Sequence, residues 1–117
     1  MIQKSNAKPE NLESRTFKFA KDCRDFIKAL SSSITNIEYA KQLTRSSASV
    51  AANYIEANES LSKKDFLLRM RISRKETKES RMWLKLIETT QINEQERLID
   101  ESTELLKILS AIISKVS

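Results

Sequence analysis

The sequence predicts an all-α protein, an antiparallel four-helix bundle whose consecutive helices run up, down, up and down. Apolar and small residues recur at alternating steps of three and four in four separate blocks, the period of helices that face a core. No stretch alternates with the period of two that a half-buried strand shows. Connections between the blocks are short, which favours antiparallel neighbours.

The first block predicts a helix over residues 11–31. A polar region precedes this block, and we therefore expect residues 1–10 to form a disordered tail outside a bundle domain of residues 11–117. The core-facing series is Leu12, Thr16, Phe19, Cys23, Phe26 and Leu30.

The second block predicts a helix over residues 36–58. Thr35, followed three residues later by Glu38, is typical of a residue that caps a helix start. The core-facing series is Ile37, Ala40, Thr44, Ser47, Ala51 and Tyr54. Small side chains dominate residues 46–53, so we expect this helix to approach its neighbours closely. A second reading is that its open side meets another subunit.

The third block predicts a helix over residues 63–90, capped by Ser62 with Asp65 three residues later. Between Leu61 and Lys85 there are nine Lys or Arg against three acids, a net charge of +6 where the whole chain has +5. Charge segregated in this way favours a polyanionic partner. The core-facing series is Phe66, Met70, Ser73, Thr77, Ser80, Leu84 and Ile87.

The fourth block predicts a helix over residues 94–116, with Asn93 and Glu96 as its capping pair. Its core-facing series is Leu98, Ser102, Leu105, Leu109, Ile112 and Val116, beside a second row of Ile92, Ile99, Leu106 and Ile113. The core of one bundle would not bury both rows, so we expect a second subunit of a homo-oligomer to cover the remaining apolar surface.

The composition excludes most familiar chemistries. The chain has 117 residues, enough for one domain, and contains neither Gly nor His. It therefore has no glycine-rich phosphate loop and no imidazole base. The single cysteine, Cys23, indicates a reducing compartment, and no segment is apolar enough to span a bilayer. We expect a soluble cytoplasmic protein with no cofactor, no metal, no small-molecule substrate and no membrane contact.

Three segments carry a resemblance to a known family. Residues 42–57, residues 62–66 and residues 74–84 resemble the helix-two signature, the following helix start and the helix-three signature of the "four helix bundle protein" family. Residues 16–20 resemble its usual opening. The likeness covers about residues 14–88, and helix four matches only in pattern.

The family includes proteins encoded by intervening sequences in bacterial 23S ribosomal RNA genes, also called S23 ribosomal proteins, and accessory variability proteins of diversity-generating retroelements. The resemblance implies an antiparallel four-helix bundle that assembles into a homopentamer. For the retroelement members it further implies a basic surface that engages a reverse transcriptase and nucleic acid.

Seven cations of the third block are candidate nucleic-acid ligands. In helical register five of them lie opposite the apolar residues, and Arg74 and Arg81 flank that row. The seven are Lys64, Arg71, Arg74, Lys75, Lys78, Arg81 and Lys85. Such a face would hold phosphates without reading sequence. The alternative is a solvated face, neutralised by acids of helix four in the same or a neighbouring subunit: Glu94, Asp100, Glu101 and Glu104.

Other polar and aromatic residues have structural explanations beside their functional ones. The acid pairs Glu56 with Glu59 and Glu76 with Glu79 suit a hard cation or acid–base chemistry, but no imidazole completes such a site. The remaining residues are better explained by packing than by base stacking or reactivity: Trp83, Tyr39, Tyr54 and Cys23. Arg45 is a candidate partner for Glu56 or Glu76.

These observations favour a non-enzymatic, homo-oligomeric bundle, expected from the resemblance to be a pentamer. It would bind RNA or a nucleoprotein, either a reverse transcriptase or a ribosomal complex, through the basic face. The alternative is a protein-only scaffold that recruits a partner protein and binds no nucleic acid. A carboxylate metalloenzyme is the third hypothesis.

Overall fold

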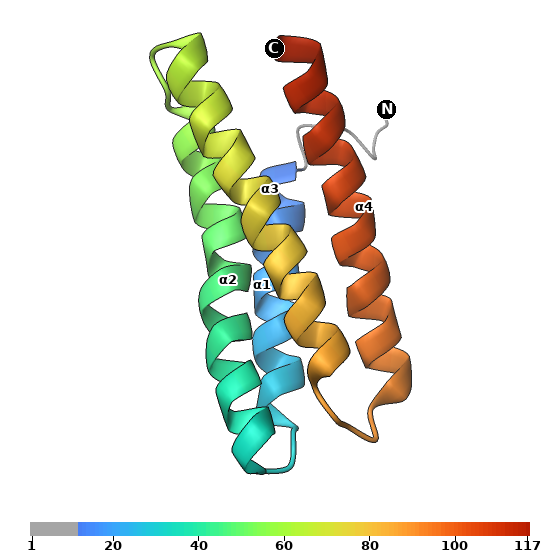
Figure 1. The fold of residues 1–117 in the computed structure, drawn as a ribbon. Coiled ribbons are helices and arrows are strands. Elements are labelled where there is room, and N and C mark those ends of the chain that lie inside the picture. Colours follow the sequence, from blue (N-terminus) through green and yellow to red (C-terminus); the bar gives the residue numbers. More distant parts are fainter. Residues whose placement is uncertain (1–11) are drawn as a thin grey trace.

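Four α-helices joined by short loops make up the part of the chain that the computed structural model describes, residues 12–117 (Figure 1). The helices are α1 (Leu12–Lys28), α2 (Ile34–Asn58), α3 (Lys63–Leu86) and α4 (Ile92–Val116). Consecutive helices are joined at alternating ends of the bundle (Figure 1). The predicted all-α bundle is confirmed, and the predicted tail over residues 1–10 lies outside the described residues.

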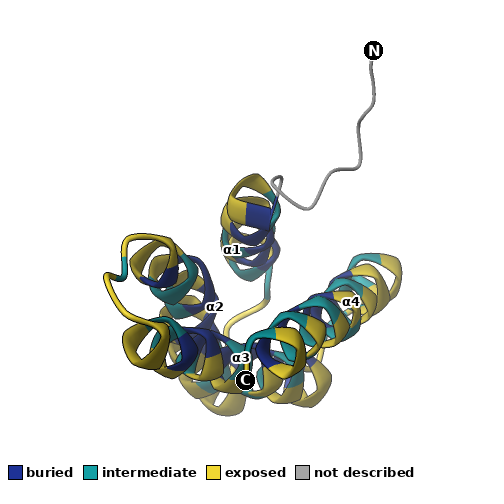
Figure 2. Cartoon of the chain, turned by 90° about the horizontal axis from the view of Figure 1, so that it is seen from above, coloured by how far each residue is buried: buried dark blue, intermediate teal, exposed yellow. Residues whose placement is uncertain are grey.

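The helices surround a single core, and each one contacts two others. α2 and α3 have the most extensive contact, whereas α1 and α4 have the least. Viewed along the bundle, α1 and α3 lie on opposite corners, and the buried residues face the centre (Figure 2). Within the described helices, none combines the length and the apolar character that crossing a bilayer requires.

α1 buries one narrow stripe and ends three residues before its predicted end. The stripe consists of every third or fourth residue of the helix from Leu12 to Phe26, and all of its residues are buried. The backbone N–H of Ala29 bonds to the carbonyl of Phe26 at 3.2 Å, and that of Leu30 bonds to Ile27 at 3.1 Å. These shorter-range bonds tighten the last turn and end the helix.

The predicted cap of α2 at Thr35 is wrong. Ser33 is the cap, with an extended backbone and a hydroxyl that accepts from the N–H of Asn36 at 3.1 Å. Three consecutive serines precede the helix, and any of them has a hydroxyl suited to capping. The spacing of Thr35 and Glu38 therefore did not decide where the helix begins.

The buried side chain of Asn36 joins the start of α2 to the loop after α3. Its amide donates to the carbonyl of Glu88 at 2.7 Å, and its oxygen accepts from the N–H of Glu88 at 3.1 Å. Ile87 is already extended, so α3 ends at Leu86 and not at residue 90 as the sequence predicted. The backbone of Glu88 finds its hydrogen bonds on α2 instead of within a longer helix.

The two remaining capping predictions have opposite outcomes. Ser62 caps α3 as predicted, because its hydroxyl accepts from the N–H of Asp65 at 3.0 Å. α4 begins at Ile92 after Gln91, which makes no side-chain capping bond, so the predicted cap at Asn93 is wrong. Gln95 ties the two helices together by donating to carbonyl oxygens at the end of α3, at 2.8 and 2.9 Å.

Small hydroxyl residues make the contact between α2 and α3 close, as the sequence predicted. The hydroxyls of Ser46 and Ser80 lie 2.7 Å apart, and both residues are fully buried. Ser73 donates to the backbone carbonyl of Val50 at 2.8 Å. The polar atoms that allow this close approach are therefore satisfied across the interface or by the helix backbone.

Cys23 and the outer row of α4 complete the core. Cys23 is fully buried, and burial raises the pKa of its thiol to about 12. In the second apolar row of α4, Ile113 is buried, Ile99 and Leu106 are half-buried, and Ile92 is exposed. The single chain thus covers most of this row. The row therefore gives less support to a homo-oligomer than the sequence indicated.

Candidate nucleic-acid interface

α3 carries all seven candidate cations on its outer surface. Arg74 and Arg81 are half-buried, which agrees with their predicted place at the flanks. The other five are exposed: Lys64, Arg71, Lys75, Lys78 and Lys85. The apolar face of the helix lies in the core at Met70, Ser73 and Leu84, so helix formation alone places the cations outside.

Five of these cations form a straight row, which we name the α3 ladder: Arg71, Arg74, Lys78, Arg81 and Lys85. They recur at alternating steps of three and four, so they follow one line along the helix. Over this span the helix rises about 21 Å, and successive positions of the row are on average about 5 Å apart along the helix axis. The α3 ladder differs from the predicted row, because it includes the flanking Arg74 and Arg81 and leaves out Lys64 and Lys75.

The α3 ladder lies on the side of α3 that faces α4. The guanidinium of Arg81 donates from Nε to the hydroxyl of Thr103 on α4 at 2.9 Å. On the opposite side of α3, Glu76 and Arg69 bond to residues of α2. Thr103 holds Arg81 without neutralising it, so the bond fixes a cation in the row and leaves its charge available.

Within residues 12–117, none of the seven candidate cations forms an ion pair. Three of the α4 acids proposed to neutralise them pair elsewhere in the same chain. Glu101 pairs with Arg15 at 2.7 Å, Glu94 with Arg97 at 2.6 Å, and Glu104 with Lys107 at 3.3 Å. Neutralisation of the basic face by these acids of the same chain is therefore wrong.

An ion-pair group that the sequence analysis missed joins α1 to α4. Arg97 contacts both Glu94 and, at 3.0 Å, Asp22 of α1, and Lys18 contacts Asp22 at 2.7 Å. Hydrogen bonding by Arg97 lowers the pKa of Glu94. Partial burial acts to raise the pKa of Asp22, but the bonds from Lys18 and Arg97 outweigh it and lower that pKa. These acids remain charged and are already occupied.

Arg45 of α2 occupies one of the two predicted acid pairs. Its guanidinium lies 3.3 Å from Glu76 and 3.2 Å from Glu79, and the bond to Glu76 raises the pKa of Arg45. Of the two partners considered for Arg45, the structure selects Glu76. The other acid pair, Glu56 and Glu59, lines a hollow at the α2–α3 loop. Residues 12–117 contain no group of three potential ligands that could hold a metal ion.

Trp83 packs against α2 on the far side of α3 from the α3 ladder. Its ring stacks on that of Tyr39 with centroids 6.0 Å apart and planes 29° apart, and both rings are half-buried. The indole Nε1 is buried and has no hydrogen-bond partner among the described residues. Tyr54 is also half-buried against the core. Packing explains these aromatics, and Trp83 cannot reach a base held on the α3 ladder.

Comparison with known proteins identifies one family and one similar solved structure. The sequence profile of the family described as 23S rRNA-intervening sequence protein matches residues 11–114. The chain is also similar to a solved structure from Bacteroides thetaiotaomicron VPI-5482, a protein of unknown function from the S23 ribosomal protein family. That similarity has a TM-score of 0.76 and 28% identity, and it covers 90% of this chain and 96% of the other. No curated protein matches the chain.

Proposed function

Because the chain belongs to the 23S rRNA-intervening sequence protein family, we propose that it is a non-enzymatic protein that binds RNA, or an RNA–protein complex, through the α3 ladder. One observation carries this proposal: five cations stand in a straight row, and none of them is ion-paired within residues 12–117. Neither the family description nor that of the similar structure names a reaction.

The α3 ladder suits the backbone of a nucleic acid better than its bases. Phosphates attract Lys and Arg at any sequence, and their counterions are released on binding. Direct reading of bases would need side chains that reach base edges or stack on them. Trp83 is turned toward α2, so binding through the ladder would be strongly salt-dependent and weakly sequence-dependent.

We also propose that the protein self-associates as a pentamer, the assembly that the family resemblance implies. Several large apolar side chains are exposed on the single chain, among them Ile34, Leu61 and Leu68. Subunit contacts would cover part of this surface. A ring of subunits would also present several α3 ladders at once and strengthen RNA binding through avidity.

A salt titration of RNA binding tests the proposal. For the intact protein, the logarithm of affinity should fall steeply and linearly with the logarithm of salt concentration. Arg71→Glu and Lys78→Glu should each weaken binding and flatten the slope, as should Lys75→Glu beside the ladder. Lys115→Glu on α4, with the same change of charge, is the matched control. Absence of RNA binding at low salt, or equal losses in the control, would overturn the proposal.

A further inference from the structure

An apolar groove runs along the outer side of α1 and α2, away from the α3 ladder. It consists of two hollows, of about 310 Å³ and about 250 Å³, which adjoin because Thr44 lines both of them. Apolar and small side chains form its floor, including Ile37 and Ala40 in the larger hollow and Ala20 and Ala48 in the smaller one. Within residues 12–117, no group of potential metal ligands accompanies it, and the polar lining of the larger hollow includes Ser31, Ser32 and Asn36.

Two large side chains at this groove are unusually exposed. Phe17 is 65% exposed at one end, and Ile37 is 45% exposed toward the other. Exposed aromatic and branched side chains around a hollow mark a surface that gains free energy when another apolar surface covers it. The groove thus has the character of an interface whose partner is absent from the single chain.

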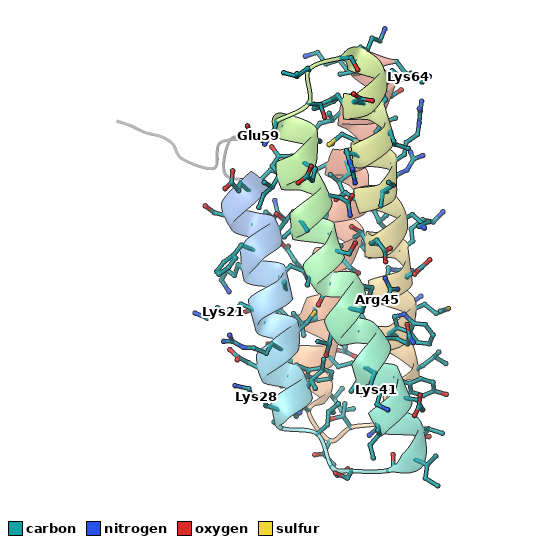
Figure 3. All side chains as sticks on the ribbon, turned by 90° about the vertical axis from the view of Figure 1, so that its left-hand side faces the viewer. Lys21, Lys28, Lys41, Arg45, Glu59 and Lys64 are labelled. Atoms are coloured by element: carbon teal, nitrogen blue, oxygen red, sulfur yellow. The ribbon has the colours of Figure 1, made fainter. Side chains whose placement is uncertain are left out.

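The rim of the groove is cationic. Lys21 and Arg24 line the smaller hollow and Lys41 lines the larger one. Lys28 follows Lys21 and Arg24 along α1, and Figure 3 shows Lys21 and Lys28 on α1 and Lys41 on α2. Asp25 pairs with Arg24 at 3.1 Å and Glu38 with Lys41 at 3.6 Å.

Two cations of α1 keep their charge for a partner: Lys21, which lines the smaller hollow, and Lys28, which lines neither hollow and lies two turns further along the same side of α1. Lys21 and Lys28 are exposed and have no ion pair with any residue of 12–117. Acidic side chains on a partner would be attracted to this rim, whereas basic ones would be repelled. The charge of the rim thus selects the kind of molecule that can cover the apolar floor.

We propose that this groove binds an amphipathic helix of a partner protein, with an apolar stripe that faces the floor and acidic residues that face Lys21 and Lys28. From Ile37 to Ala48 the floor is about 16 Å long, which matches about three turns of a helix. Helices held in grooves of this kind are anchored by apolar residues at steps of three and four. The small side chains of Ala40 and Ala48 let a partner backbone approach closely.

The groove favours a protein helix over a nucleic acid because its floor is apolar. Phosphates would meet Lys21 and Lys28 but would leave the exposed surfaces of Phe17 and Ile37 uncovered. A base could stack on the ring of Phe17, but no second aromatic ring lines either hollow. Binding at the groove is independent of RNA binding at the α3 ladder.

A second copy of the chain is a poorer occupant than a helix from another protein. The exposed apolar residues of α3 include Leu68 and Met82, but the cations of α3 stand beside them and would meet a cationic rim. α4 has exposed acids at Glu96 and Asp100, yet Ile92 is its single large apolar side chain that is exposed. Neither helix combines an apolar stripe with acidic flanks.

Binding of a synthetic helix tests the proposal directly. The probe is a lactam-bridged peptide of about 14 residues, with Leu at steps of three and four and Glu on both flanks. The comparison peptide has Lys in place of Glu. The acidic peptide should bind at least about tenfold more tightly, as measured by fluorescence anisotropy. Amide shifts in nuclear magnetic resonance spectra should change at Ala20, Ala40 and Ala48.

Variants locate the binding and test its electrostatics. Phe17→Ala and Ala48→Glu change exposed residues, so the fold should persist, and each should weaken the acidic peptide at least about tenfold. Lys21→Glu combined with Lys28→Glu should reverse the preference in favour of the basic peptide. Lys107→Glu combined with Lys115→Glu on α4 changes the charge equally and should leave peptide binding unchanged.

Four outcomes would overturn the proposal. They are the absence of saturable binding, equal binding of the acidic and basic peptides, a lower particle mass by light scattering in Phe17→Ala, and loss of RNA binding in the groove variants. The third would assign the groove to a second copy, and the fourth to nucleic acid. Failure of RNA binding in the α3 ladder variants alone bears on the proposed function and leaves the groove untouched.

Discussion

The carboxamide of Asn36 forms two hydrogen bonds with the backbone of Glu88, which is 52 residues away in the sequence. The contact satisfies one N–H and one carbonyl at the point where α3 has ended. It also fixes the start of α2 against the loop that leads into α4. A single buried side chain thus sets the relative position of three helices at one end of the bundle.

Asn36→Ala should destabilise the fold by about 1–3 kcal/mol, because it leaves backbone groups of Glu88 without partners. Urea unfolding followed by circular dichroism measures the change. Asn58→Ala, at an exposed position of α2, is the control and should stay within about 0.5 kcal/mol of the parent. Equal effects of the two substitutions would show that the contact with Glu88 is not important for stability.

The helix caps give a second prediction. Ser33→Ala and Ser62→Ala should each cost about 0.5–2 kcal/mol, since each removes the acceptor of a backbone N–H at a helix start. Thr35→Ala and Asn93→Ala should change stability by less than about 0.5 kcal/mol, because neither side chain caps a helix. Thermal melting separates the two groups, and a reversed order would contradict the observed caps.

The buried hydroxyl pair of Ser46 and Ser80 should behave non-additively. Ser46→Ala alone leaves the hydroxyl of Ser80 without its partner in a dry interface, which should cost about 1–3 kcal/mol. Replacing both serines by alanine removes both polar groups, so the double variant should be more stable than the sum of the single losses indicates. Strict additivity in a double-mutant cycle would show that the two hydroxyls do not interact.

The ion-pair group around Arg97 predicts a pH dependence. In the folded chain the pKa values of Asp22 and Glu94 lie below their ordinary values of 3.8 and 4.5. Each depressed pKa contributes stability that is complete above the ordinary value and is lost as pH falls through the lowered one. Arg97→Met should therefore reduce the melting temperature at neutral pH, and its deficit should shrink in strong acid. A deficit that is constant with pH would contradict this assignment.

The number of helices and the buried faces of α1, α3 and α4 could be predicted because both depend on local periodicity, and Phe19, Met70 and Leu105 are buried where the spacing placed them. The predicted face of α2 is wrong in its first half, because Ile37 and Thr44 are exposed and the neighbouring Leu43 is buried instead. The helix ends could not be predicted as well. Several serines compete to cap α2, and the end of α3 depends on a contact between Asn36 and Glu88 that no local pattern reveals.

The candidate site was predictable in part for the same reason. The spacing of the cations on α3 places them on the outer surface, as the structure confirms for Lys78 and Lys85. Whether acids of α4 neutralise these cations depends on which other cations lie close enough to pair with the acids in the folded chain. Arg15 reaches Glu101 from α1, which is a tertiary contact that no local pattern reveals, whereas Arg97 pairs with Glu94 one turn away within α4. The groove between α1 and α2 was missed because it exists only after the two helices have packed.

Modification of the single cysteine, Cys23, can be used to measure transient opening of the bundle. The sulfur of Cys23 is sealed in the centre and protonated at neutral pH, so a thiol reagent can modify it only in molecules that have transiently come apart. The rate of modification then measures how often α1 separates from its neighbours. The measurement requires neither a denaturant nor an added label, and binding of RNA or of a partner helix would be registered as slower modification.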